Sequence, residues 1–264
     1  MTELTSVLAR PGVDIRYSDS PGIQPAVVFL HGAGADHVSF DAQAAAVRAS
    51  GRRVVLVDLR AHGQSRPNTS RLTAETFVDD IDAIVTELRL LRPVLAGHSL
   101  GGNIGQALVR RHSERFAGLI VMGSTWNTGP LTVVERLLLK LAAPALALIP
   151  AKNLNRIMAD ASAVTSFAKA DAVRAFSQLS KREFIDVWRA TVELVAPEEG
   201  YRTPVPLLLI RGAEDRTGNI ATAMAAWAGA EGVVEHVIPG AGHLVTQDAP
   251  DETADVILTF LQVS

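Results

Sequence analysis

The chain has 264 residues, of which 48% are hydrophobic and 20% charged, and it contains no cysteine. This composition is typical of one globular α/β domain, and the lack of cysteine excludes disulfides, thiol catalysis and cysteine-ligated clusters, which fits a cytoplasmic location. The net charge of −3 includes no run of Lys or Arg, so nucleic acid is not an expected partner.

The first elements that the sequence predicts form a hairpin. Residues 1–4 lack the basic and apolar regions of a signal peptide, so no export signal is expected. Residues 6–9 and 13–18 flank Pro11-Gly12, which is a turn signal. The two segments are expected to pair as antiparallel strands at the edge of a sheet.

Short apolar runs without a polar alternation follow along the chain. They occupy residues 27–30, 54–57, 93–96, 119–122 and 206–210, and a late strand is expected at 233–238. Such runs are typical of strands buried on both faces of a parallel sheet. Between them, residues 73–90 carry apolar side chains at helical spacing. The alternation predicts an α/β fold with a mostly parallel central sheet and helices on both faces.

Residues 126–202 interrupt this alternation, because they are compatible with helix and contain no buried-strand run. We therefore expect a helical cap, or lid, over 126–202, and a core made of residues 1–125 and 203–264. The longest apolar stretch, 131–150, lies in this cap. It contains Glu135, Lys140 and Pro144, which exclude a membrane-spanning helix.

A stripe of apolar side chains repeats at helical spacing near the start of the cap. It comprises Val133, Val134, Leu137, Leu138 and Leu141. The expectation is that this stripe packs the cap onto the core. The alternatives are that part of it lines an acyl pocket, contacts a lipid surface, or forms a dimer face in a homo-oligomer. The same alternatives apply to Phe167, Phe176 and Phe184.

The sharpest motif is Gly97-His98-Ser99-Leu100-Gly101, a G-x-S-x-G sequence between the strand at 93–96 and a helix expected to begin near Asn103. A nucleophile elbow needs this strand–turn–helix context, because the tight turn leaves no room for side chains at the two glycines. Ser99 is therefore the candidate nucleophile, held at the positive end of the following helix.

A serine hydroxyl needs a general base at neutral pH. Among the seven histidines, His243 is the candidate because it lies on a glycine-rich loop after the late strand. Asp215 follows the strand at 206–210 and is the candidate to orient the imidazole, with the adjacent Glu214 as the alternative. The order Ser99, Asp215, His243 is the one expected for this architecture.

The turn His31-Gly32-Ala33-Gly34 directly follows the strand at 27–30. A loop at this place supplies one backbone N–H to an oxyanion hole, and the residue after the nucleophile supplies the other. The candidate donors are therefore the amides of Ala33 and Leu100.

Together these motifs resemble the α/β-hydrolase superfamily, in particular its members with a serine nucleophile and a helical cap. The resemblance extends from the hairpin to Leu261. It includes the segment 58–65, Asp-Leu-Arg-Ala-His-Gly-Gln-Ser, which is similar to that group's D-x-R-G-H-G-x-S stretch except for Ala61 in place of glycine. The resemblance implies eight strands, a cap after the sixth strand and an esterase-like or lipase-like activity. For segment 58–65 it implies a structural role around the nucleophile.

These residues predict a serine hydrolase that cleaves a carboxylic ester, or a similar acyl bond, of a small, uncharged and moderately apolar substrate through an acyl-enzyme. No cofactor or metal is expected, because the H-E-x-x-H and G-x-x-x-x-G-K motifs are absent from the sequence. The open alternatives are C–C bond hydrolysis, perhydrolysis or lyase chemistry with the same triad, and a small-ligand receptor on a hydrolase scaffold.

Overall fold

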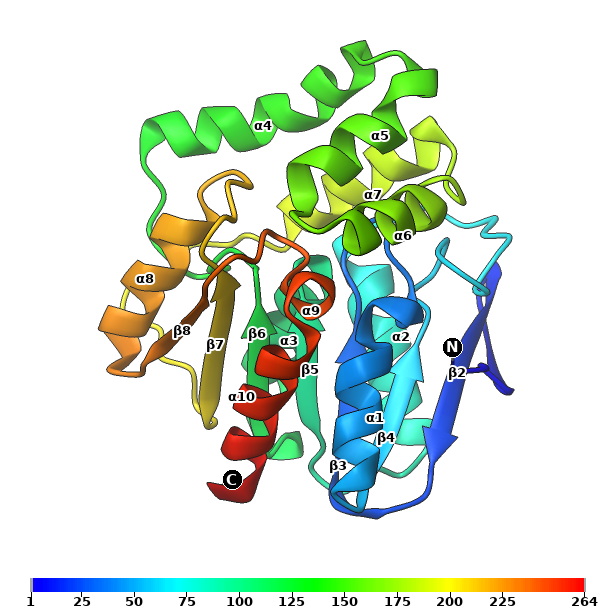
Figure 1. The fold of residues 1–264 in the computed structure, drawn as a ribbon, viewed down its shortest axis with the longest axis vertical. Coiled ribbons are helices and arrows are strands. Elements are labelled where there is room, and N and C mark those ends of the chain that lie inside the picture. The colour runs from blue at the N-terminus through cyan, green and yellow to red at the C-terminus, as the bar shows by residue number, and fades with distance from the viewer. Residues whose placement is uncertain (1, 264) are drawn as a thin grey trace.

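A computed structural model describes residues 2–263 and contains one eight-stranded sheet (Figure 1). The strands are β1 (Ser6–Arg10), β2 (Val13–Ser20), β3 (Ile23–Leu30), β4 (Arg52–Val57), β5 (Val94–His98), β6 (Gly118–Met122), β7 (Leu207–Gly212) and β8 (Glu235–Ile238). Their order across the sheet is β1-β2-β4-β3-β5-β6-β7-β8. Strand β2 pairs antiparallel with β1 and β4, and the strands from β4 to β8 pair in parallel. The predicted edge hairpin and mostly parallel sheet are confirmed.

Helices cover both faces of the sheet (Figure 1). Helices α1 (Asp41–Ala49) and α10 (Pro250–Val263) lie on one face, and α2 (Ala74–Glu87), α3 (Leu100–Arg111) and α8 (Ile220–Glu231) lie on the other. Shorter helices are η1 (His37–Phe40), η2 (Ser113–Arg115) and α9 (Val245–Asp248). On β3, Val27 and Phe29 are buried against one layer, and Val28 and Leu30 against the other. Apolar side chains on both faces of a strand are therefore explained by a layer of helices on each side.

Helix α3 begins at Leu100, three residues earlier than the sequence predicts. Ser99 has φ 50° and ψ −116°, so the chain reverses direction at this single residue. The turn therefore needs no further loop residues between β5 and α3. Other element ends differ as well; for example, β3 begins at Ile23, four residues before the predicted strand, α2 ends at Glu87 and β8 begins at Glu235.

Four helices are inserted between β6 and β7: α4 (Val133–Leu148), α5 (Ala151–Ser162), α6 (Ser166–Phe176) and α7 (Lys181–Glu193). They lie above the carboxyl ends of the strands (Figure 1), so the predicted helical insertion after the sixth strand is confirmed. We propose that the cap extends over residues 126–202, as the sequence predicts. Its first residues are anchored on the core, because Trp126 stacks on Trp227 of α8 and the Asn127 amide donates to Gln106 of α3.

The expectation that the α4 stripe packs onto the core is wrong. Val133, Val134, Leu137, Leu138 and Leu141 are 84%, 65%, 55%, 61% and 49% exposed. The opposite face of the helix, with Ala143 buried, turns toward the protein. Almost every turn of α4 carries apolar side chains on both faces, so the spacing alone did not identify the buried one. Within residues 2–263, no helix combines the length and apolar character needed to cross a membrane.

Candidate active site

The sheet topology brings the predicted site residues to one edge. Strand β3 lies between β4 and β5. After β3 the chain forms β4 on one side of it and then crosses over to form β5 on the other side. In such sheets a crevice forms at this point beyond the carboxyl ends of the strands. The turn at 31–34 follows β3, and Ser99 follows its neighbour β5. Asp215 follows β7 and His243 follows β8 at the same edge.

The turn that carries Ser99 is held by two close backbone approaches. A Cβ on Gly97 would overlap the backbone of Gly101, and a Cβ on Gly101 would overlap the carbonyl of Leu30. The prediction that this turn excludes side chains is confirmed. The positive φ of Ser99 costs a non-glycine residue roughly 1–3 kcal/mol, so the surrounding packing has to hold it.

The predicted nucleophile, base and acid are in contact. The Ser99 hydroxyl donates to His243 Nε2 at 3.1 Å, and His243 Nδ1 donates to Asp215 Oδ2 at 2.9 Å. Burial alone would raise the pKa of Asp215, but the hydrogen bond and charge of His243 and the Thr217 amide lower it below its ordinary value. An ionised carboxylate only accepts hydrogen bonds. Nδ1 therefore carries the imidazole proton, and Nε2 is free to accept one.

The alternative acid, Glu214, does not share this position. Its side chain is half-exposed, and its carboxylate lies 3.7 Å from Arg216 at the surface. Of the two neighbouring acids, the geometry brings Asp215 to His243.

Both predicted oxyanion donors border this group. Within residues 2–263, neither the Ala33 amide nor the Leu100 amide has a hydrogen-bond acceptor. Leu100 opens α3, where helix N–H groups have no partner in the helix. Ala33 is held in place by its neighbour, since the Gly34 amide donates to His62 Nε2 at 3.0 Å. Burial lowers the pKa of His62 to about 3, so its ring is neutral and able to accept.

Segment 58–65 therefore supports the turn at 31–34 rather than the nucleophile turn itself. In addition to the His62 bond, the Leu59 amide donates to His31 Nε2 at 3.0 Å. Ala61, which stands where the resembling family has glycine, has φ 66°. This left-handed conformation explains the family's preference for glycine at that position.

His98 was not singled out from the sequence, but it contacts the loop of the predicted base. Its Nε2 donates to the His243 carbonyl at 2.8 Å, and the two rings are 4.8 Å apart. Burial and the nearby His243 lower the pKa of His98 to about 3, so the ring is neutral. Within the described residues its Nδ1 is buried without a partner, beside Gly32. The chain separation of 145 residues gave the sequence no signal for this contact.

The cap is tied to Asp36, just after the turn at 31–34, by an ion pair in which Asp36 is buried and the Arg174 side chain is 40% exposed. Arg174 of α6 donates to both oxygens of Asp36, at 2.7 and 2.9 Å, and Gln178 adds a third bond at 2.9 Å. Burial alone would raise the pKa of Asp36, but Arg174 and Gln178 lower it to about 2. Phe176 also packs on Gly34, where a Cβ would overlap its ring.

A second carboxylate ties the cap to the loop of His243. Asp248 accepts from the Gly242 amide at 2.9 Å, and from the amide and hydroxyl of Thr165 at 2.8 and 2.9 Å. Thr165 is the N-cap of α6. Helix α6 is thus bound at one end to the His243 loop and at the other to the turn at 31–34. Asp36 and Asp248 lie outside recognisable motifs, and so does Arg174.

A cavity of about 100 Å³ opens beside Ser99. Its walls are mostly apolar, and it is lined by Ala33, Ser99, Asn103, Thr125, Leu139, Trp188, Thr191, Val192, Val195, Thr217, Gly218, Asn219 and Ile220. Leu139, Trp188 and Val192 come from the cap, and none of the lining side chains is ionisable. The cavity therefore suits an uncharged group held against Ser99.

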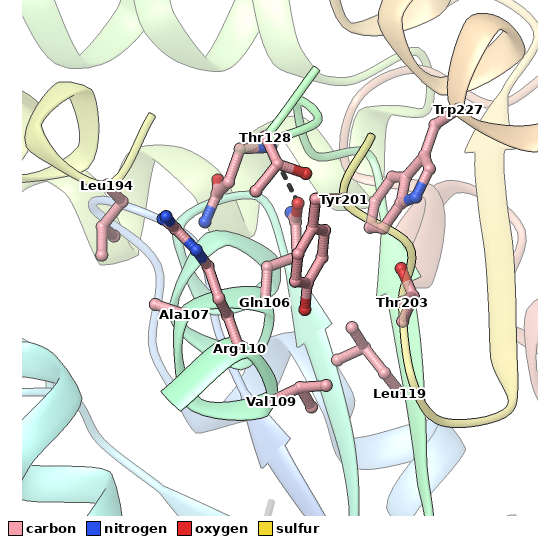
Figure 2. Close-up of a pocket in the computed structure, with 11 residues that line it drawn as sticks. Gln106, Ala107, Val109, Arg110, Leu119, Thr128, Leu194, Tyr201, Thr203 and Trp227 are labelled. Atoms are coloured by element: carbon pink, nitrogen blue, oxygen red, sulfur yellow. Dashed lines mark hydrogen bonds between the residues drawn. The ribbon is translucent and has the colours of Figure 1, made fainter. Parts of the chain in front are cut away.

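Figure 2 shows a second, smaller cavity on the outer side of α3, lined in part by Gln106, Tyr201 and Trp227. Its volume is about 30 Å³, roughly the space of one water. No described residue lines both cavities. Of these two cavities, only the one beside Ser99 is lined by predicted site residues, namely Ser99 and Ala33.

The capped eight-stranded sheet defines an α/β-hydrolase fold. Residues 27–256 match the alpha/beta hydrolase family, and the chain belongs to that family. The sn-1-specific diacylglycerol lipase ABHD11 of Mus musculus is 25% identical over 259 residues, which cover 92% of this chain and 83% of that protein. Two solved structures share the fold. A thermophilic esterase from Thermogutta terrifontis has a TM-score of 0.78 at 22% identity and covers 97% of this chain and 96% of its own. A meta-cleavage product hydrolase from Pseudomonas fluorescens IP01 has a TM-score of 0.78 at 21% identity, covering 98% of each chain.

The buried neutral histidines predict a stability that falls in mild acid. His62 and His98 have pKa values of about 3 in the folded protein, against an ordinary value of 6.5. Below pH 6.5 the unfolded chain binds more protons, so each histidine lowers the free energy of unfolding by about 1.4 kcal/mol per pH unit. Urea unfolding between pH 6.5 and 5 measures this slope.

The variant His98→Gln keeps a donor for the His243 carbonyl but cannot bind the extra proton on unfolding. It is expected to reduce the slope by the contribution of one histidine, about 1.4 kcal/mol per pH unit. The matched change His112→Gln, at a half-exposed position, is expected to leave the slope unchanged. An equal slope in wild type and His98→Gln would contradict the neutral, buried state of His98.

Proposed function

We propose that this protein is a serine hydrolase that cleaves a carboxylic ester, or a similar acyl bond, of a small and moderately apolar substrate. The observation that carries the proposal is the chain of contacts from Ser99 Oγ to His243 Nε2 at 3.1 Å and from His243 Nδ1 to Asp215 at 2.9 Å. This geometry suits an activated serine, because the base and the group that orients it are both within hydrogen-bond reach.

In the proposed mechanism, His243 accepts the Ser99 proton as Oγ attacks the ester carbonyl. The amides of Ala33 and Leu100 stabilise the oxyanion. The bond to the alcohol then breaks, and His243 returns the proton to that leaving group. A water, deprotonated in turn by His243, attacks the acyl-enzyme and releases the acid with Ser99 restored. Asp215 holds the imidazole tautomer and stabilises its charged form.

The cavity supports an uncharged substrate. Its walls are mostly apolar and its side chains carry no ionisable group, so a carboxylate or ammonium on the bound part of the substrate would lose water without gaining a counter-charge. Leu139 and Trp188, from the proposed cap (126–202), line this cavity and would contact the bound part of the substrate. The activities of two similar proteins, a diacylglycerol lipase and an esterase, agree with ester chemistry.

Ser99→Ala is expected to lower ester hydrolysis by about 10⁴-fold or more, because it removes the attacking atom. A fluorophosphonate probe is expected to label wild-type protein at Ser99, as located by mass spectrometry, and to label neither Ser99→Ala nor His243→Ala. His112→Ala serves as the histidine control and should be labelled like wild type. Hydrolysis by Ser99→Ala at the wild-type rate would refute the proposal. Ligand-induced stabilisation without labelling or turnover would favour a receptor.

Asp215→Asn tests the choice between the two neighbouring acids. It is expected to lower kcat by about 10⁴-fold, because an amide favours the wrong imidazole tautomer. Glu214→Gln, one residue away and exposed, is expected to keep the wild-type kcat. The reverse pattern would assign the orienting role to Glu214.

A panel of p-nitrophenyl esters tests the uncharged cavity. Butyrate ester is expected to have a kcat/KM at least about tenfold above that of the hemisuccinate, whose carboxylate would be desolvated without a partner. Faster turnover of the charged ester would show that the substrate lies outside this cavity.

A further inference from the structure

Helix α4 presents its apolar side chains to solvent. Val133, Val134, Leu137, Leu138, Leu141 and Leu148 are each about half-exposed or more. At 3.6 residues per turn, they fall within one arc of about 140° on the helix surface. A continuous exposed stripe of this kind is uncommon on a protein that stays free in water, and marks a surface that contacts something else.

The outward direction of this stripe is fixed by contacts at both ends of α4. Near its start, Asn219 donates to Glu135 at 2.8 Å. At its end, Lys181 of α7 donates to the carbonyls of Ala147 and Ile149, at 2.6 Å each. Between them, Leu139 points inward and lines the cavity beside Ser99. The helix therefore has one face toward the cavity and the opposite, more apolar face toward the outside.

Basic side chains accompany the stripe. On α4, Arg136 and Lys140 follow one border of the apolar arc, and on α5 Lys152 and Arg156 are also exposed. Among the described residues, none of the four forms an ion pair with an acidic side chain. The two helices carry only two acidic residues, Glu135 and Asp160, although the chain as a whole has a net charge of −3. The apolar surface is therefore bordered on one side by Arg136 and Lys140, whose positive charge no acidic side chain of the described residues compensates.

We infer that the outward face of α4 docks on an anionic phospholipid surface. A helix that lies in a membrane interface buries an apolar face among the acyl chains and places Lys and Arg beside the headgroup phosphates. The α4 stripe and its basic border have this arrangement. The inference concerns a surface outside the proposed active site, and it does not depend on the reaction that occurs there.

Charge favours a lipid surface over a second copy of the chain. A symmetric dimer through this face would bring the same patch of both copies together. In an antiparallel pairing of the two α4 helices, Arg136, Lys140 and their symmetry mates would lie along the same border, and in either pairing the patch offers no acidic group to pair with them. An anionic bilayer offers opposite charge to the same side chains.

Flotation of the purified full-length protein with lipid vesicles tests this inference. The protein is expected to bind vesicles that contain phosphatidylglycerol, and to bind pure phosphatidylcholine vesicles at least about tenfold more weakly, because the charge contribution is lost. High salt should release it. Leu137→Ser/Leu141→Ser is expected to weaken binding at least about tenfold, since both side chains lie outside the cavity and would enter the acyl region.

The matched control is Leu91→Ser/Val234→Ser, which changes two similarly exposed side chains on the core and should bind like wild type. Thermal melts establish that each variant is folded, and fluorophosphonate labelling reports the state of Ser99 separately from vesicle binding. Failure of folded wild type to float with phosphatidylglycerol vesicles would overturn the inference, as would equal loss in the control variant. If the wild type does not bind vesicles but is a dimer, and Leu137→Ser/Leu141→Ser is a monomer, then the outward face of α4 contacts a second copy of the chain instead of lipid.

Discussion

The contact of the first turn of α3 with the end of β3 is the constraint on which the rest of the site depends. Only glycine at position 101 permits the helix to approach the Leu30 carbonyl this closely. With the helix this close, the chain reverses direction at Ser99 alone. The Leu100 amide then lies at the N-terminus of α3, where it has no partner within the helix. The turn after β3 begins at His31, directly beyond the same carbonyl. One close approach of backbone to backbone thus places the hydroxyl and both candidate amides next to each other.

The remaining parts of the site are positioned by polar groups from distant parts of the chain. His62 holds Gly34, His98 holds the His243 carbonyl, and Asp36 and Asp248 bind the two ends of α6. His62, His98 and Asp36 are buried and Asp248 is partly buried, so removing the partner of any of them would leave a desolvated polar group unpaired. Helix α4 differs, because within the described residues its hydrogen bonds to the rest of the protein lie at its two ends. The cap therefore combines one helix that is firmly bound to the site with another that is lightly held above it.

The sequence predicted the sheet, its edge hairpin, the helical insertion and the residues that meet at Ser99, because these follow from local patterns. Buried strands are recognised by continuous apolar runs, and the elbow by glycines at a fixed spacing. The contacts of His98 and Arg174 could not be predicted in this way, since their partners are over a hundred residues away and any polar side chain is compatible with many partners. The prediction of which face of α4 is buried was wrong for another reason. A helix that is apolar nearly all round has no polar face to indicate which side meets water.

The two carboxylates that bind α6 also bear on how such proteins diverge. Asp248 belongs to the core, but its carboxylate accepts hydrogen bonds both from the His243 loop and from the cap. A cap transplanted from a relative would keep the geometry of the base only if it brought a hydroxyl residue equivalent to Thr165. It would also need a cation equivalent to Arg174 to satisfy Asp36. Exchanging the cap would therefore also disturb the position of the catalytic base. We expect the residues at these two junctions to be inherited together in caps and cores of this architecture.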